Sequence, residues 1–389
     1  MRVLAAFDKF KDSLSAERAC EIAVQAIHAH HRDWTVDACP LSDGGDGFAE
    51  ILTRSAGGKL MRFQASGPHG AGVEAAIGLV PLARIPAAAR ALLDLPDSLG
   101  TGLIAVIEMA SASGLSLLSR EQRDPWQTTT LGTGQLIHAA AELGVRAILL
   151  GVGGSATHDL GLGALEALGL NFLNAAGGRL SPPVPASWPR LSRIEGSVSA
   201  SIPPIRIACD VKNPVLGPTG AAAIYGPQKG LAAEDFPRLD AASTQVVSLL
   251  CAHVGQSTEI AALPGAGAAG GIAFGLMAAA GARLLPGFEL VAAWLDLAPR
   301  IGRADLVLTG EGHFDDSSLS GKGPGAVARM ATAAAKEVHI FAGRISTAHP
   351  PAGVHLHPIT PEEMSLSVAL REAPLNLLYE IETAFPGGA

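Results

Sequence analysis

Apolar runs and amphipathic segments alternate at the start of the chain. Residues 1–7 form an apolar run typical of a buried strand, and residues 16–31 repeat apolar side chains at helical spacing. A second strand is predicted over residues 35–41, and a glycine-rich loop and a short helix follow it. Repeated strand–loop–helix units build a parallel sheet, whose ligands bind beyond the carboxyl ends of its strands.

The same pattern returns near the end of the chain, whereas the middle differs. Residues 60–82 alternate in the manner of antiparallel strands. Further strands are predicted over residues 103–109, 146–150, 205–209, 305–309, 338–341 and 354–359. A loop and helix are predicted over residues 132–143, and further helices over 232–254, from 324 onward and over 362–384. Because the two ends share one pattern, a domain inserted between them fits this order better than two consecutive domains.

The composition argues against several classes of protein. Hydrophobic residues make up 48% of the 389 residues and charged residues 16%, which indicates a large core rather than a disordered chain. The net charge of −8 and the lack of a basic stripe argue against a nucleic-acid partner. The four cysteines lie far apart without a CxxC pair, so we expect no disulfide scaffold, no iron–sulfur cluster and no structural zinc, and a reducing compartment fits.

One uncharged stretch, residues 260–282, raises the question of a membrane span. It contains Pro264 and six glycines, and its hydrophobicity comes mainly from alanine, so a buried loop and helix is the better interpretation. The apolar start of the chain runs directly into Asp8 and Lys9 and is too short for a signal peptide. We therefore expect a cytoplasmic protein with no membrane partner.

The loops after the first two strands combine acidic residues with lysine or glycine. Residues 8–13 include Lys9 and Lys11, which can neutralise phosphate, and aspartates, which can hold Mg²⁺ or accept a proton; a solvated charged turn is the alternative. Residues 42–47 read Ser-Asp-Gly-Gly-Asp-Gly. Their glycines let backbone N–H groups approach an anion that the two aspartates would repel, and a metal-bridged phosphate resolves this conflict.

A third loop, residues 151–159, lies between a predicted strand and a helix. Its backbone amides and the hydroxyls of Ser155 and Thr157 form a natural anion site at a helix N-terminus. The loop also matches the G-x-G-x-x-A pattern, but a dinucleotide site requires an acidic residue about 20 residues later. Residues 171–180 contain none, so we do not expect NAD.

Two later loops complete the polar set. Asp210 ends a predicted strand, and Asn213 or Gln228 could bind substrate hydroxyls. Residues 309–315 combine glycines with acidic residues, and Lys322 follows them. The chain contains no Walker A spacing, yet acid, lysine and glycine at a strand end are typical of phosphoryl transfer.

Taken in order, these motifs resemble one known family. They are DKFKDSLSA (8–16), LSDGGDG (41–47), IEMASASGL (107–115), TTLGTGQLI (129–137), GGSATHD (153–159), ACDVKNP (208–214), GPQKG (226–230), PGAGAAGG (264–271), TGEGHFD (309–315) and GKGP (321–324). Over nearly its whole length the chain is similar to the bacterial two-domain glycerate kinases of the non-Walker type.

The resemblance implies both an activity and an architecture. The activity is ATP-dependent phosphorylation of D-glycerate, with Mg²⁺ as cofactor, ADP as a product and 2-phosphoglycerate favoured over 3-phosphoglycerate. The fold is α/β, with a Rossmann-like parallel-sheet domain formed by both chain ends (residues 1–60 and 297–389). A second α/β domain (residues 61–296) is inserted between them, and the active site lies in the cleft between the domains. A homodimer is one option for the assembly.

From the chemistry of the loops, together with this resemblance, we hypothesise the site residues. The lysines would contact phosphates or the glycerate carboxylate, and Asp210 and Asp315 would hold Mg²⁺ or act as the base. The catalytic set is Lys9, Lys11, Asp210, Asp315 and Lys322. The set for substrate or phosphate binding is Asp8, Ser13, Asp43, Gly44, Gly45, Asp46, Gly153, Gly154, Ser155, Thr157, Asp159, Asn213, Gln228, Lys229, Thr309, Gly310 and Glu311.

Several positions depart from the family pattern. The family usually has Asn at His158, Gly at Leu160, Arg at His313 and Gln at Ser317. Arginine can bind a phosphate or carboxylate through two parallel hydrogen bonds, which histidine cannot do, so His313 bears on substrate choice. Two alternatives therefore stay open: a kinase for a related hydroxy acid, and a catalytically weak homologue that binds ligand without turnover.

Overall fold

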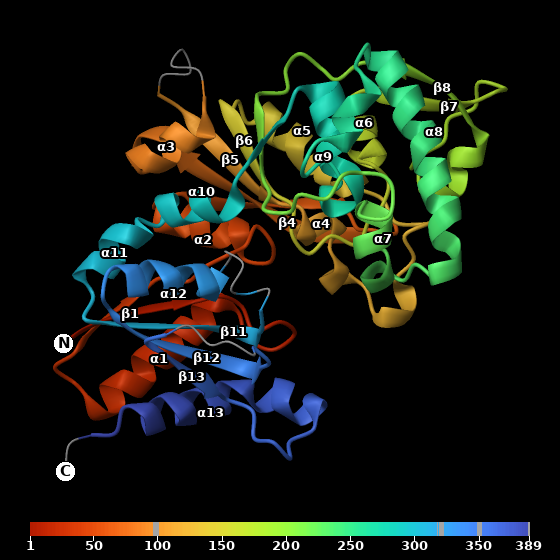
Figure 1. The fold of residues 1–389 in the computed structure, drawn as a ribbon. Coiled ribbons are helices and arrows are strands. Elements are labelled where there is room, and N and C mark those ends of the chain that lie inside the picture. The colour runs from red at the N-terminus through yellow and green to blue at the C-terminus, as the bar shows by residue number, and fades with distance from the viewer. Residues whose placement is uncertain (96–100, 317, 319–322, 348–351, 388–389) are drawn as a thin grey trace. The chain divides into compact units, whose positions relative to one another are not determined.

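Two units make up the computed structural model, which describes residues 1–95, 101–316, 318, 323–347 and 352–387 (Figure 1). The first unit holds both ends of the chain, Met1–Asp43 and Val291–Ala389, and the second holds Gly44–Leu290. Each unit combines helices with its own sheet. The predicted fold class is confirmed: the two ends form a Rossmann-like parallel-sheet domain, and a second α/β domain is inserted between them.

The first unit is a parallel sheet between two layers of helices. Within the described residues its strand order is β13-β12-β11-β1-β2, and every neighbouring pair is parallel. The strands are β1 (Arg2–Phe7), β2 (Thr35–Ala38), β11 (Leu306–Phe314), β12 (Glu337–Ile345) and β13 (Val354–Pro358). The helices are α1 (Ala16–His30), α11 (Leu297–Arg303), α12 (Gly323–Ala333) and α13 (Leu366–Ala384). Helices α1 and α13 cover one face of the sheet, and α11 and α12 lie on the other (Figure 1).

Side-chain alternation along β1 explains how this unit is packed. Val3, Ala5 and Phe7 belong to the apolar cluster shared with α1 and α13, because alternate residues of a strand point to the same face. Helix α1 begins where the Ser15 hydroxyl accepts a hydrogen bond from the backbone N–H of Arg18. A cap of this kind stabilises a helix by about 1 kcal/mol. The loop between β1 and α1 is therefore anchored at its helical end.

Strand β11 is longer than the sequence predicts. It continues from Leu306 through residues 310–314, which we expected to form a loop, because it stays in register with β12 as far as the pair Phe314–Ile345. Gly310 permits this close pairing, since a Cβ there would lie 2.0 Å from the carbonyl oxygen of Phe341. The predicted residues of this segment therefore stand on a strand end rather than on a free loop.

The second unit is built on a mixed sheet. In the described part of the chain its order is β10-β9-β6-β5-β4-β3, with β3, β4 and β5 antiparallel, as predicted for residues 60–82, and the remaining pairs parallel. The strands are β3 (Lys59–Ser66), β4 (Gly72–Pro81), β5 (Leu103–Glu108), β6 (Ala147–Gly151), β9 (Ile205–Ala208) and β10 (Arg283–Leu285), with β7 (Leu170–Asn174) and β8 (Leu191–Gly196) forming a separate pair. The helices are α2 (Phe48–Ser55), α3 (Ala87–Leu93), α4 (Ala110–Ser113), α5 (Leu131–Glu142), α6 (Leu162–Ala167), α7 (Ala221–Tyr225), α8 (Phe236–Val254), α9 (Ala268–Ala280) and α10 (Gly287–Trp294), which runs into the first unit.

The boundary between the units differs from the one expected from the sequence. Residues 44–60 group with the second unit, and residues 291–296 group with the first. Helix α2 packs against β3, β4 and β5 and buries Phe48, Ile51 and Leu52. The sequence changes character only at Gly57 and Gly58, but the apolar face of α2 decides where this segment packs.

The uncharged stretch at residues 260–282 lies in the core of the second unit. Helix α9 buries Ile272, Phe274 and Leu276. A Cβ on Gly275 would lie 2.3 Å from the carbonyl oxygen of Leu160, so small residues here serve close packing. Among the described helices, none is both long and apolar enough to cross a membrane.

Candidate active site

Four carboxyl groups gather beyond the carboxyl ends of β1, β2 and β11 in the first unit. Asp8 follows β1, Asp43 lies after β2, Glu311 is on β11 and Asp315 follows it. Burial, together with the negative charges of Asp8, Asp315 and Asp43, raises the pKa of Glu311 to about 7. Burial, together with the charge of Asp43, also raises the pKa of Asp8 to about 7. The parallel sheet thus brings together acidic residues that are about 300 positions apart in the sequence.

Lys9 places an ammonium group among these carboxylates. Its Nζ lies 2.7 Å from Asp43 Oδ1 and 4.0 Å from Asp8 Oδ1. Asp8 Oδ1 also accepts a hydrogen bond from the backbone N–H of Lys9 at 2.7 Å. Both contacts act to lower the pKa of Asp8, but burial outweighs them. Three predicted site residues therefore meet at one point.

The carboxylate cluster fits a divalent cation. Glu311 Oε1 is buried and has no hydrogen-bond partner within the described residues. Carboxylate oxygens are ligands that Mg²⁺ prefers, and a bound cation would stabilise the charged form that burial disfavours. From the sequence we expected Asp315 to be a metal ligand, and Glu311 only to bind substrate or phosphate. The unpartnered oxygen of Glu311 is a signal that only the packed structure provides.

The other predicted residues of the first unit hold the backbone or lie at its surface. The Thr309 hydroxyl is buried and donates to the carbonyl oxygen of Ala6 at 2.6 Å. The Gly310 carbonyl accepts a hydrogen bond from the backbone N–H of Asp8. The Ser13 hydroxyl donates to the carbonyl of Phe10 and closes a turn, whereas Lys11 is exposed. Lys322 lies outside the described residues.

Two predicted glycine loops pack against each other in the second unit. The N–H of Gly153 donates to the carbonyl oxygen of Gly44 at 2.9 Å. A Cβ on Gly153 would lie 2.7 Å from the backbone of Gly45, and one on Gly151 would lie 2.6 Å from the Gly44 carbonyl oxygen. The glycines therefore allow a backbone approach that a side chain would block.

Within these two loops, Gly154 has a φ of +70° and Asp46 is exposed. A Cβ on Gly154 would lie 3.6 Å from Asp46 Oδ1, so the acidic side chain stands against the glycine turn. Anion binding by these loops stays a prediction, and the geometry gives their glycines a packing role as well.

Lys229 is a buried cation that holds the third loop from inside. Its side chain is 1% exposed, and its Nζ donates to Ser155 Oγ at 2.9 Å and to the carbonyl oxygen of Thr157 at 2.7 Å. Burial lowers the pKa of Lys229 to about 7, although the charge of Asp159 acts in the opposite direction. We predicted that Lys229 binds substrate or phosphate; in the structure its ammonium group orders residues 155–157.

Asp159 is fully buried and fastens two segments of the second unit together. Its carboxylate accepts hydrogen bonds from the backbone N–H and hydroxyl of Thr130, the hydroxyl of Thr129, and the backbone N–H groups of Gly161 and Gly163. Burial nevertheless raises the pKa of Asp159. These bonds secure the start of α6, so Asp159 acts here as a structural hub.

Of the family departures within the described residues, two lie in the core. His158 is 1% exposed, its Nε2 lies 3.3 Å from Ser243 Oγ, and burial together with the charge of Lys229 lowers its pKa to about 3. The imidazole is therefore neutral. Leu160 is fully buried and has a φ of 53°, in the left-handed region. Both side chains are therefore enclosed in the core of the second unit.

His313 differs from these two because it is exposed on β11. Its Nε2 lies 2.7 Å from Ser346 Oγ, and its Nδ1 lies 4.0 Å from Asp315 Oδ2. Of the described departures, His313 is therefore the one that stands beside the carboxylate cluster. Ser317 lies outside the described residues.

The predicted residues of the fourth loop are engaged within the second unit. Asp210 Oδ2 accepts a hydrogen bond from the backbone N–H of Phe288 at 3.0 Å. Asn213 Oδ1 accepts one from the Tyr225 hydroxyl at 2.7 Å, and its amide nitrogen donates to a backbone carbonyl. Gln228 is exposed. Asp210 and Asp315, the two predicted metal ligands, belong to different units.

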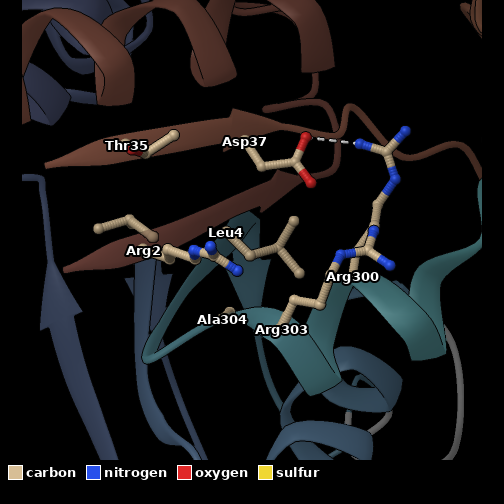
Figure 2. A pocket seen from close by; sticks show the side chains of 8 residues that line it. Arg2, Leu4, Thr35, Asp37, Arg300, Arg303 and Ala304 are labelled. Atoms are coloured by element: carbon tan, nitrogen blue, oxygen red, sulfur yellow. Dashed lines mark hydrogen bonds and ion pairs between the residues drawn. The ribbon is translucent and has the colours of Figure 1, made fainter.

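A pocket of about 140 Å³ lies at the opposite, amino-terminal end of the first unit's sheet. Figure 2 shows three arginines around it, Arg2, Arg300 and Arg303, and the pairing of Arg300 with Asp37. Because ligands of parallel sheets bind beyond the carboxyl ends of the strands, this pocket is not the candidate active site. The candidate active site is the carboxylate cluster at the other end of the sheet.

Known proteins are similar to this chain over most of its length. The family model described as the glycerate kinase family matches residues 3–385. A glycerate kinase from Haemophilus influenzae is 34% identical over 388 residues, which cover 97% of this chain and 96% of that protein. A glycerate 2-kinase from Escherichia coli is 35% identical over 354 residues, which cover 89% of this chain and 86% of that protein.

A solved structure agrees with these sequence matches. The crystal structure of a candidate glycerate kinase 2 from Salmonella typhimurium LT2 superposes with a TM-score of 0.75 at 35% sequence identity. The superposition covers 99% of this chain and 97% of that one. The likeness therefore extends to both units of the chain.

Proposed function

The chain belongs to the glycerate kinase family, and we propose that it uses ATP and Mg²⁺ to phosphorylate D-glycerate, with 2-phosphoglycerate as the favoured product. The observation that carries this proposal is the cluster of Asp8, Asp43, Glu311 and Asp315 around Lys9 at the carboxyl ends of the first unit's strands. A relative named glycerate 2-kinase supports the 2-position.

The acidic residues of the cluster would hold the cation. Phosphoryl transfer depends mainly on positioning and on stabilising spread negative charge. When bound, Mg²⁺ would supply positive charge to the phosphates of ATP. Glu311, through its unpartnered Oε1, and Asp315 beside it would be its ligands in this unit. Asp210 remains a proposed Mg²⁺ ligand in the second unit.

Asp8 is the residue we assign as proton acceptor. A general base works best when its pKa lies near the working pH, and burial brings the pKa of Asp8 to about 7. In this scheme the glycerate oxygen bonds to the γ-phosphorus of ATP, the bond to the ADP oxygen breaks, and the hydroxyl proton passes to the Asp8 carboxylate. Lys9, adjacent to Asp8, would contact a phosphate or the glycerate carboxylate.

The test of this function is ADP release from ATP and Mg²⁺ with D-glycerate, L-glycerate and a panel of other hydroxy acids. We expect turnover on D-glycerate, with ³¹P NMR identifying 2-phosphoglycerate. Turnover restricted to another hydroxy acid would move the assignment to a related kinase, an outcome that His313 beside Asp315 favours. Ligand binding without turnover on any acid would contradict the proposal.

The same assay tests the role of Asp8. Asp8→Asn should lower kcat by about 10²–10⁴-fold because the amide accepts no proton, and wild-type kcat/KM should fall below a pH of about 7. Asp33→Asn, at an exposed aspartate, is the matched control and should keep wild-type turnover. A folded Asp8→Asn variant with near-native kcat would remove Asp8 from the mechanism.

A further inference from the structure

Three histidines and two glutamates gather on the first unit's sheet, away from the carboxylate cluster. Glu337 and His339 lie near the start of β12, His355 and His357 lie on β13, and Glu380 is on α13. The parallel register pairs His339 with His355. Since alternate residues of a strand share a face, these side chains meet on the side of the sheet that α13 covers.

Three of these residues bring ligand atoms close enough for one ion. Glu337 Oε1 lies 3.1 Å from His339 Nε2 and 4.0 Å from His355 Nε2, and all three atoms lie within 4.8 Å of one another. Two ligand atoms of a tetrahedral Zn²⁺, each about 2.1 Å from the metal, lie roughly 3.4 Å apart. The side chains of Glu337 and His355 are 58% and 59% exposed. They can therefore move from their present spacing to the spacing of a zinc site, and an ion can reach them from solvent.

His339 is the rigid member of the group. Its side chain is 8% exposed, and its ring stacks on His355 with centroids 4.5 Å apart and on His357 with centroids 5.0 Å apart. Packing therefore fixes the direction of both ring nitrogens. A preformed orientation of this kind is what a metal-binding imidazole requires.

Hydrogen bonds behind His339 decide which of its nitrogens carries a proton. His357 Nδ1 lies 3.5 Å from Glu380 Oε1, and His357 Nε2 lies 2.9 Å from His339 Nδ1. A carboxylate only accepts, so the tautomer in which His357 Nδ1–H faces Glu380 has His357 Nε2 accepting a hydrogen bond from His339 Nδ1–H. This assignment leaves a lone pair on His339 Nε2 facing the Glu337 carboxylate. In this tautomer a proton or a metal ion joins His339 Nε2 to Glu337 Oε1, which lie 3.1 Å apart.

We propose that Glu337, His339 and His355 bind one divalent transition-metal ion of the zinc class, which fastens β13 to β12. Imidazole suits Zn²⁺ and its neighbours, whereas Mg²⁺ prefers oxygen ligands, so this site is distinct from the carboxylate cluster. His357 and Glu380 are positioning residues that orient the His339 ring. The cysteine spacing led us to expect no structural zinc, but these ligands are alternate residues of two strands rather than a cysteine motif.

The experiment is a calorimetric titration of the full, EDTA-treated chain with ZnCl₂ in the presence of millimolar Mg²⁺. Wild type should bind one equivalent, and Zn²⁺ should raise its Tm. His355→Ala and Glu337→Gln, at exposed positions, should weaken binding at least tenfold and abolish the Tm shift. Glu380→Gln should weaken it by about 10–100-fold through the His339 ring. His138→Ala is the matched control, since it removes a histidine that faces a single glutamate on α5.

Co²⁺ gives a second readout, because a site with imidazole ligands should produce a visible absorption band that His355→Ala loses. Failure of wild type to bind Zn²⁺ would mean that a proton joins Glu337 and His339, and would overturn the proposal. Binding that is equal in wild type, His355→Ala and Glu337→Gln would place the ion elsewhere and would overturn it as well. None of these readouts depends on kinase activity.

Discussion

Burial sets the ionisation of individual residues in the motif loops. The pKa of Lys229 falls to about 7, and the pKa values of Asp8 and Glu311 rise to about 7. The cause is the same in each case, because a low-dielectric environment disfavours whichever form is charged. For Lys229 the consequence is structural, since its ammonium group holds residues 155–157. For Asp8 and Glu311 it leaves carboxyl groups poised to bind a cation or accept a proton.

At Leu160, in the core, backbone strain destabilises the fold while burial of the side chain stabilises it. Its left-handed backbone costs an L-residue about 1–2 kcal/mol, whereas removal of a fully buried leucine side chain costs roughly 2–5 kcal/mol. Burial is the larger effect, so Leu160→Gly should lower the free energy of unfolding by roughly 1–3 kcal/mol, although the family usually has glycine there. Urea unfolding measures this difference.

Leu160→Ala separates the two effects at this position. It loses most of the buried side chain but keeps the Cβ and therefore the backbone strain, so it should be less stable than Leu160→Gly by about 1 kcal/mol. Equal stability of Leu160→Gly and wild type would show that the surrounding helices close over the space and that strain is the larger effect.

At the scale of elements, the two glycine loops of the second unit depend on close backbone contact. Gly153→Ala would place a Cβ 2.7 Å from the backbone of Gly45, and should destabilise the chain by about 1–3 kcal/mol and reduce kcat by displacing the loops. Gly302→Ala in α11 is the matched control, because nothing lies within 4 Å of its Cβ. That variant should be as stable as wild type or gain roughly 0.5–1 kcal/mol. Thermal unfolding that left Gly153→Ala unchanged would refute the close contact.

At the scale of the whole molecule, the carboxylate cluster should make stability depend on pH. Glu311 has a folded pKa of about 7, above its ordinary value, so its contribution is fully present below a pH of about 4 and is lost as pH rises through about 7. Without Mg²⁺, Glu311→Gln should therefore gain stability relative to wild type at pH 8 and gain little at pH 5. Thermal unfolding at the two pH values checks this.

Two controls sharpen that measurement. Mg²⁺ at pH 8 should stabilise wild type more than Glu311→Gln, because the ion binds the charged carboxylate. Glu142→Gln, at an exposed glutamate, should show no such dependence on pH. A Glu311→Gln variant that shifts equally at pH 5 and pH 8 would mean that Glu311 is not the group responsible.

Local patterns in the sequence predicted the order of strands and helices and the fold class. The apolar run before Asp8, the helical spacing after Ser15 and the alternation over residues 60–82 depend only on neighbours along the chain, so they could be interpreted without a structure. The ordered motifs likewise indicated the family. The predicted site residues Asp8, Lys9 and Asp43 do meet, because the ends of parallel strands share one edge.

Other features depend on contacts between distant parts of the chain, and the tertiary structure alone decided them. Asp159 and Lys229 are buried and hold neighbouring backbone segments in place, and burial raises the pKa of Glu311. The pattern of apolar and polar residues along the chain does not indicate that a polar loop residue is buried. The boundary between the units lies at residues 43–44 because α2 packs against the sheet of the second unit. The group around His339 exists because the parallel pairing of β12 with β13 places His339 beside His355, and that pairing joins two segments that are separate in the sequence.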